Sequence, residues 1–128
     1  MSWSVLIVDD EPMTRNLLRM ILSYAGYTVS EAEDGYDALD KIAQQMPDLV
    51  LLDLMMPQLD GIDVCKRVRQ NETTAHLPII MLTADTRSDS RDASMLAGAD
   101  RFLMKPISRK DLLAEIQDLM ADKVAGNQ

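Results

Sequence analysis

The chain has 128 residues, 47% of them hydrophobic and 27% charged, a composition typical of one folded globular domain. Its formal net charge of −8 argues against direct binding to nucleic acid or to an anionic membrane, because both require a basic surface. No apolar run approaches the roughly 20 residues that cross a bilayer, and no secretion signal opens the chain. The single cysteine, Cys65, cannot form an internal disulfide, so we expect a reducing, cytoplasmic environment.

Five short apolar runs are spaced along the chain, and we predict that each is a β-strand. The run Leu49–Leu52 is apolar without a break, as expected of a strand that is covered by helices on both sides. The runs and the residues at which they end are, in chain order, Val5–Val8 before Asp9-Asp10, Tyr27–Val29 running towards Ala32, Leu49–Leu52 before Asp53, Leu77–Leu82 before Thr83, and Arg101–Met104 before Lys105.

Between these runs, apolar residues recur at helical spacing. The first helix should begin near Pro12 and stop at Gly26, and the second should close before Pro47. Asp60 is a suitable N-cap for the third helix and Ser108 for the fifth. The fourth, roughly 88–97, has few large apolar residues. The apolar positions expected on the five helices are Met13, Leu17, Leu18, Ile21 and Leu22; Ala38, Leu39, Ile42 and Ala43; Ile62, Val64, Cys65 and Val68; Met95 and Leu96; and Leu112, Leu113, Ile116, Leu119 and Met120.

Strands and helices therefore alternate with short connections, which predicts an α/β domain with right-handed crossovers. We expect a five-stranded, parallel, doubly wound sheet of the flavodoxin-like kind, with strand order 2-1-3-4-5 and helices on both faces. Residues 1–128 should form a single domain, with a core at about 4–122 and a tail at 123–128 that is frayed from Val124 onwards.

Polar side chains follow several strands of this sheet, at the edge where open α/β folds bind ligands. Asp9, Asp10, Asp53, Thr83 and Lys105 should converge there. Clustered carboxylates repel one another unless a cation intervenes, and oxygen ligands favour a hard ion such as Mg2+. A carboxylate beside Mg2+ can attack phosphorus to give an acyl phosphate, while the metal and a lysine neutralise the transferring group.

These features resemble the receiver domain of two-component response regulators, which is CheY-like. The resemblance covers Ser4 to about Asp122 and rests on four segments taken together. They are VDDEP, LLDLMMPQLDG, MLTA and AGADRFLMKP.

The resemblance implies that Asp53 accepts a phosphoryl group from a phosphohistidine on a histidine kinase or phosphotransfer protein. It implies that Mg2+ is held by Asp9, Asp10, Asp53 and the backbone carbonyl of Met55. Thr83 and Lys105 would contact the phosphoryl group, and Phe102 would turn inward on activation. A cis peptide is expected between Lys105 and Pro106. The chain would be a signalling phosphoacceptor rather than an enzyme, and a monomer or a weak dimer once phosphorylated.

Taken singly, several of these residues have ordinary structural roles. Asp10 is as suitable for an N-cap as for a metal ligand, and both roles can hold together. Phe102 alone favours a core position, and Cys65 and His76 have no partner at metal-ligand spacing. The methionines, apart from Met55, are interpreted as core filler. Met55 lies two residues after Asp53, where its side chain should influence how long the phosphoryl group survives.

Three other functions are possible for such a chain. A metal-dependent phosphatase with an aspartyl nucleophile usually has a DxD pattern after its first strand, whereas Asp9-Asp10-Glu11 stands here. A flavin module would bring its phosphate against an acidic loop. An unphosphorylated docking module would be expected to lose the charged positions, and all are present. The sequence leaves open the downstream target and whether an effector domain is fused to the chain.

Overall fold

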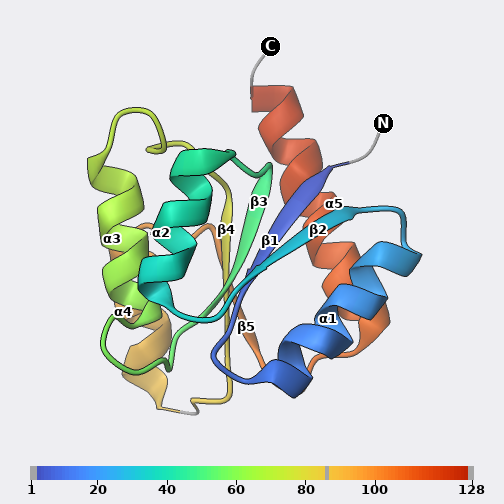
Figure 1. Ribbon diagram of the computed structural model, residues 1–128, viewed down its shortest axis with the longest axis horizontal. Coiled ribbons are helices and arrows are strands. Elements are labelled where there is room, and N and C mark those ends of the chain that lie inside the picture. Colours follow the sequence, from blue (N-terminus) through green and yellow to red (C-terminus); the bar gives the residue numbers. More distant parts are fainter. Residues whose placement is uncertain (1–2, 86, 127–128) are drawn as a thin grey trace.

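Five strands alternate with five helices along the chain, which confirms the predicted order of elements (Figure 1). The structure is a computed structural model that describes residues 3–85 and 87–126. The strands are β1 (Ser4–Val8), β2 (Thr28–Ala32), β3 (Leu49–Asp53), β4 (Ile79–Thr83) and β5 (Arg101–Met104); the helices are α1 (Pro12–Tyr24), α2 (Gly35–Gln44), α3 (Gly61–Gln70), α4 (Ser88–Ala97) and α5 (Arg109–Gly126).

The strands form one parallel sheet in the order β2-β1-β3-β4-β5, as predicted. Every residue of β3 and of β4 is buried, which explains why their sequences are apolar without alternation. β2 lies at an edge of the sheet, and its burial alternates along the strand. Because all five strands are parallel, their carboxyl ends meet along one edge of the sheet.

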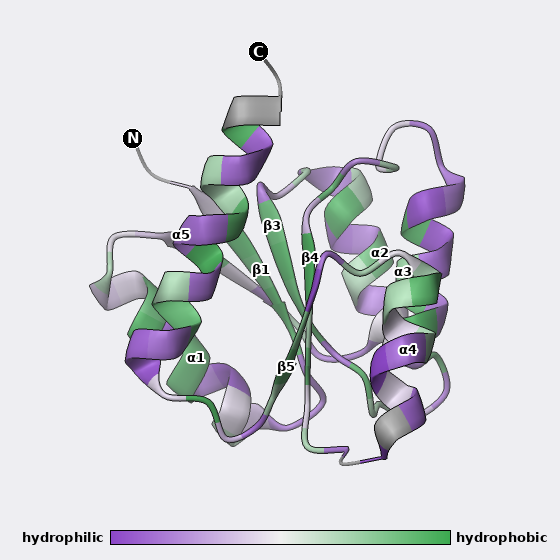
Figure 2. Cartoon of the chain, turned by 180° about the vertical axis from the view of Figure 1, so that it is seen from behind, coloured by the Kyte–Doolittle hydropathy of each residue, from purple (hydrophilic) through white to green (hydrophobic). Residues whose placement is uncertain are grey.

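Helices cover both faces of the sheet (Figure 1). α1 and α5 pack on one face around Leu22, Leu112 and Ile116, and α2, α3 and α4 pack on the other around Ile42, Val64 and Ala97. In Figure 2 the central strands are mainly hydrophobic, whereas hydrophobic and hydrophilic residues alternate along the helices. No helix in the described part of the chain is long and apolar enough to cross a membrane.

Two helix caps and one cis peptide bond agree with the predictions from the sequence. The Asp60 carboxylate accepts a hydrogen bond from the backbone N–H of Asp63 at 2.9 Å, and so it caps α3. The Ser108 hydroxyl accepts one from Asp111 at the start of α5. The peptide bond between Lys105 and Pro106 is cis.

The predicted capping role of Asp10 is wrong, because Glu11 is the N-cap of α1. Its carboxylate accepts a hydrogen bond from the backbone N–H of Met13. Pro12 occupies the first turn, where its fixed φ angle favours the helix, and this places the cap one residue later than Asp10. The carboxylate of Asp10 is therefore not engaged in capping.

The apolar positions of α1 do not all face the core. Leu18 and Leu22 are buried, but Met13 is 79% exposed and Leu17 is 58% exposed. The interpretation of the methionines as core filler is likewise wrong for most of those described: Met56, Met81 and Met120 are buried, whereas Met13, Met20, Met46, Met95 and Met104 are exposed. Apolar spacing identifies a helix but does not say how much of its face the sheet can cover.

The C-terminal end of the domain differs from the prediction, whereas the N-terminal end does not. Trp3 packs at the start of β1 against the core on the α1 and α5 face. However, α5 continues to Gly126, so the segment expected to be frayed begins as helix. Residues 127–128 of the predicted tail lie outside the described residues.

α4 is held to the domain mainly by small side chains. Its buried residues include Ser90, Ser94 and Ala97, whereas Leu96 is 88% exposed. Gly98 ends the helix with a φ of 112°, a left-handed conformation that glycine adopts readily. This confirms the expectation that α4 buries little apolar surface.

Candidate metal and phosphoryl site

Three carboxylates meet at the carboxyl ends of β1 and β3. Oxygen atoms of Asp9, Asp10 and Asp53 all lie within 4.8 Å of one another. Asp9 and Asp53 are buried, and Asp10 is exposed at the mouth of the cluster. The donors are all oxygens, and two or three carboxylates at this spacing match the preference of a hard divalent cation. These three residues, predicted from the strand ends, are thus brought together.

The chain passes very close behind Asp53. A β-carbon built on Gly61 would lie 2.5 Å from the backbone oxygen of Asp53 and 2.8 Å from the Cα of Leu54. Only glycine fits at this point without moving the end of β3. Gly61 is the last residue of the segment LLDLMMPQLDG, but neither composition nor spacing indicated that a glycine is required at this position.

Lys105 completes the cluster from the end of β5. Its ammonium group donates to Asp9 Oδ2 at 2.7 Å and lies 3.7 Å from Asp53 Oδ1. Its backbone N–H donates to the carbonyl of Thr83 at 2.8 Å, which fixes the start of the β5–α5 loop. One cation therefore balances part of the charge of three acids.

Burial raises the pKa of the Asp53 carboxyl group from 3.8 to about 6, and repulsion from Asp9 adds to this effect. Lys105 and the backbone N–H of Met55, which donates to Asp53 Oδ1 at 3.3 Å, act in the opposite direction. The net effect is still upward, so Lys105 and the Met55 N–H do not fully offset the cost of burying a negative charge at Asp53 beside Asp9. A bound cation would favour ionisation.

The other predicted residues are not members of this acidic cluster. Thr83 is fully buried at the end of β4, and its hydroxyl accepts a hydrogen bond from the backbone N–H of Asp85 at 3.0 Å. Phe102, on β5, is partly buried against the core on the α3 and α4 face. The side chain of Met55 is 54% exposed beside the site.

Arg15 is a neighbour of the site that the sequence reasoning missed. Its guanidinium group donates to the backbone carbonyl of Asp9 at 2.7 Å. Arg15 follows Asp9 by six positions and comes from the first turns of α1, so neither strand ends nor helical periodicity marked it. Only the position of α1 over the end of β1 reveals the contact.

Cys65 and His76 are not members of the acidic cluster among the described residues. Cys65 is buried in α3, and its thiol contacts the carbonyl of Ala97 at 3.4 Å. Burial raises the pKa of this thiol. His76 is exposed in the segment before β4.

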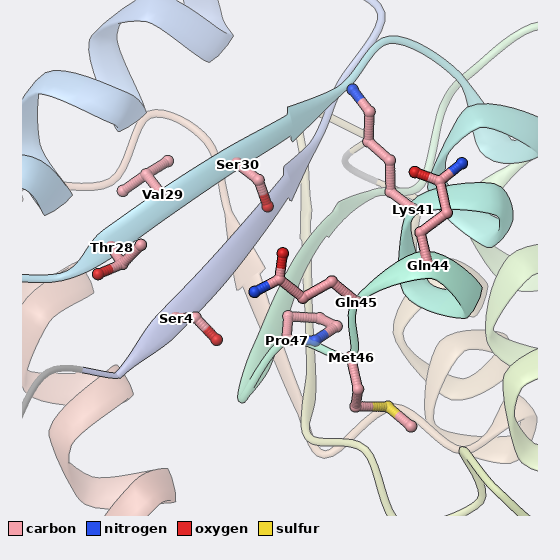
Figure 3. A pocket seen from close by; sticks show the side chains of 9 residues that line it. All are labelled: Ser4, Thr28, Val29, Ser30, Lys41, Gln44, Gln45, Met46 and Pro47. Carbon is pink, nitrogen blue, oxygen red and sulfur yellow. The ribbon is translucent and has the colours of Figure 1, made fainter.

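A separate hollow lies between β2 and the C-terminal end of α2 (Figure 3). Its lining includes Ser4 and Thr28, the first residues of β1 and β2, whereas the acidic cluster lies at the other ends of the strands. The hollow measures about 330 Å³, and its lining also includes Ser30 and Lys41. The Lys41 ammonium group already pairs with Asp37 and donates to the carbonyl of Glu31. This hollow contains no carboxylate cluster and is not the candidate phosphoryl site.

Comparison with known proteins agrees with this geometry. A family model for the response regulator receiver domain matches residues 5–117. The response regulator MprA of Mycobacterium bovis is 46% identical over 120 residues, which are 94% of this chain and 51% of that protein. MprA of Mycolicibacterium vanbaalenii is 47% identical over 116 residues, covering 91% and 49%. The chain thus spans about half the length of these curated relatives.

Solved structures give the same result. A CheY-like receiver domain protein from Methanospirillum hungatei superposes with a TM-score of 0.92 at 27% identity, covering 98% of this chain and 99% of that one. Chemotaxis protein CheY4 of Vibrio cholerae superposes with a TM-score of 0.88 at 33% identity, covering 93% and 99%.

The parallel sheet of order 2-1-3-4-5 and the acidic pocket at its carboxyl edge define a CheY-like receiver domain. The chain belongs to the response regulator receiver domain family. It is a signalling domain of two-component systems rather than an enzyme in the usual sense. The acids Asp9, Asp10 and Asp53 form the pocket that is typical of its phosphoacceptor site.

Proposed function

We propose that Asp53 is the phosphoacceptor of this domain and that Mg2+ is the cation bound beside it. The observation that supports this most is the position of the Asp53 carboxylate. It is buried at the end of β3, within 4.8 Å of the oxygens of Asp9 and Asp10, and 3.7 Å from the ammonium group of Lys105. A carboxylate in these surroundings can act as a nucleophile towards phosphorus.

In the proposed reaction, an Asp53 oxygen forms a bond to the phosphorus of a phosphohistidine while the phosphorus–nitrogen bond breaks. The imidazole of the donor leaves and takes up a proton. Asp9, Asp10 and the carbonyl of Met55 would hold Mg2+ together with Asp53. Bound Mg2+ would supply positive charge to the phosphoryl oxygens. Lys105 would move its ammonium group from Asp9 towards those oxygens as negative charge arrives.

Two further residues would couple phosphorylation to a conformational change. Thr83 would donate its hydroxyl hydrogen to a phosphoryl oxygen, and Phe102 would turn further inward. Thr83 lies at the C-terminal end of β4, in the strand next to Asp53, and its hydroxyl already contacts the loop that leads to α4. A shift of Thr83 would therefore pull directly on the segment before α4.

The donor would be a histidine kinase or a histidine phosphotransfer protein. Because the curated relatives are about twice as long as this chain, the output could pass to a fused effector domain or to a separate protein target. The acidic net charge supports protein contacts rather than direct contact with nucleic acid or a membrane. The cytoplasm stays our prediction for the location, with a monomer or a weak phosphorylated dimer as the assembly.

Phosphorylation by acetyl phosphate tests the proposal without the unidentified kinase. With Mg2+, the intact protein should gain the mass of one phosphoryl group. Removal of divalent cations with a chelator should prevent the gain, because the carboxylates would then repel the incoming anion. Equal labelling with and without Mg2+ would contradict the assigned metal.

The side chain of Met55 should influence the lifetime of the phosphoryl group. Methionine offers an attacking water only a weak acceptor, and it stands exposed beside Asp53. We expect the wild-type chain to show no unusually fast hydrolysis, and Met55→Asn and Met55→Glu to change the half-life severalfold. Decay of the phosphorylated mass after removal of acetyl phosphate measures it. Met46→Asn, at another exposed methionine far from the site, is the matched control. Unchanged half-lives in both Met55 variants would refute this role.

The surface formed by α4, β5 and α5 is our candidate for partner binding. α4 buries few large side chains, so a small free-energy difference can shift it. Saturating beryllofluoride with Mg2+, which mimics the phosphoryl group, should change amide exchange in α4 at least severalfold. α2, which lies over the other half of the sheet, should change little and provides the internal reference. Equal protection of α4 in both states would reject this surface as the switch.

A further inference from the structure

We infer that Arg15 is a positioning residue for the cation site. It would act by holding the peptide group between Asp9 and Asp10, so that the Asp10 carboxylate points into the pocket beside that of Asp9. This inference rests on the proposed function, since it concerns the Mg2+ site. It adds a residue that contacts neither the phosphoryl group nor the metal.

The backbone at the end of β1 shows where Arg15 acts. β1 pairs with β2 up to Val8 opposite Ala32, and the N–H of Asp9 still donates to the carbonyl of Ala32 at 3.2 Å. The sheet pairing ends there. The carbonyl of Asp9 instead receives the Arg15 guanidinium at 2.7 Å. Arg15 thus supplies a hydrogen bond just beyond the end of the strand ladder.

Arg15 is itself anchored from β2. Its Nε lies 3.4 Å from Glu31 Oε1, and its side chain is only 16% exposed. Arg19, one helical turn later, lies 3.3 Å from the other oxygen of Glu31, but its side chain is 46% exposed. No hydrogen bond joins Arg19 to Asp9 among the described residues. The two arginines therefore share one partner, and only Arg15 reaches the site.

Fixing the carbonyl of Asp9 has a direct effect on Asp10. A peptide group is planar, so the orientation of the Asp9 carbonyl sets the direction in which the chain leaves towards the Cα of Asp10. The Asp9 carboxylate is held separately, because its Oδ1 accepts from the N–H of Glu11 at 2.9 Å and its Oδ2 accepts from Lys105. Asp10 is exposed and is not the helix cap, so its backbone is oriented by the hydrogen bond from Arg15 to the Asp9 carbonyl together with the one from Glu11 to the Asp9 carboxylate.

The direction in which Mg2+ affinity changes when Arg15 is replaced tests the inference. Arg15 carries a positive charge close to a site for a cation, so its charge alone opposes Mg2+ binding. Neutralising Arg15 would then tighten binding. A positioning role predicts the reverse, because loosened ligands bind a metal less well. Outer-shell partners of metal ligands typically contribute about 10- to 100-fold in affinity.

The experiment is a calorimetric titration of the whole chain with MgCl2. We expect Arg15→Gln to weaken Mg2+ binding about tenfold. Arg15→Lys, which keeps the charge but cannot bridge two partners, should fall between Arg15→Gln and the wild type. Arg19→Gln, the matched control, should bind Mg2+ as the wild type does or slightly more tightly. In the metal-free protein, amide exchange at Asp10 and Glu11 should be faster in Arg15→Gln only.

The outcomes separate this inference from the proposed function. If the wild-type chain binds no Mg2+, the proposed function fails. If the wild type binds Mg2+ and Arg15→Gln binds equally or more tightly, the inference alone is overturned. Should Arg15→Gln fail to fold, Arg15→Lys decides the matter. It keeps the charge but loses the bridge between Glu31 and the Asp9 carbonyl, so a severalfold loss of Mg2+ affinity supports the inference, whereas unchanged affinity overturns it.

Discussion

Replacing Asp53 by asparagine is expected to abolish phosphorylation by acetyl phosphate, while the wild-type chain gains one phosphoryl group. The amide oxygen of asparagine is a poor nucleophile, and the substitution nearly preserves the size and shape of the buried side chain. Intact mass measurement in the presence of Mg2+ reports the result. Of all the substitutions proposed for this chain, Asp53→Asn should produce the largest change in function.

The matched control for this prediction is Asp40→Asn. Asp40 is an exposed carboxylate of α2, away from the strand ends, and its removal changes the net charge by the same amount. This variant should be phosphorylated like the wild type. Labelling of Asp53→Asn at the wild-type rate would place the acceptor elsewhere, and peptide mapping would then locate the modified residue.

The second large effect concerns stability rather than phosphorylation. Without Mg2+, Asp53→Asn should be more stable than the wild type at pH 8, by up to about 3 kcal/mol. The pKa of Asp53 is about 6 in the folded chain and 3.8 for an unperturbed group. Folding thus favours the protonated form of this residue, and ionisation at high pH works against the folded state.

The pH dependence follows from the same difference. Between pH 3.8 and about 6 the folded chain binds more protons at Asp53 than the unfolded chain, so the contribution of Asp53 to stability falls as the pH rises. Below pH 3.8 both states are protonated, and the advantage of Asp53→Asn should disappear. Subtracting the urea-unfolding free energies of the two proteins at each pH isolates this residue from the other acids. A difference that is constant between pH 4 and pH 8 would contradict the shifted pKa. Mg2+ should stabilise the wild type more than the variant.

Much of the fold could be predicted from the sequence because each strand is short, apolar and, in most cases, followed by a polar residue. In a parallel sheet these endings necessarily share one edge, which is why Asp9, Asp53 and Lys105 could be placed together from their positions in the sequence. The cis peptide before Pro106 was expected only from the resemblance to receiver domains. No local feature of the sequence required it.

What the sequence could not predict depends on how elements lie against one another. Periodicity marked Met13 and Leu17 as apolar positions of α1, but the packing of the helix on the sheet leaves both side chains exposed. The role of Arg15 depends on the angle between α1 and β1 and on the pairing of β1 with β2, which places Glu31 within reach. Glu11 displaced Asp10 as the cap because the helix starts at Pro12, and a difference of one residue is finer than sequence patterns resolve.

The close approach of Gly61 to the backbone of Asp53 has a consequence for mutational scanning. Gly61 has no side chain that could react, yet an alanine there would collide with the backbone of Asp53. A mutational survey that scores only phosphoryl incorporation would therefore rank Gly61 with the carboxylates and suggest a catalytic role, although the constraint at Gly61 is steric. Replacing Gly61 by alanine should also lower expression and melting temperature, whereas Asp53→Asn should not. Measuring stability together with phosphoryl incorporation therefore separates a steric role from a catalytic one.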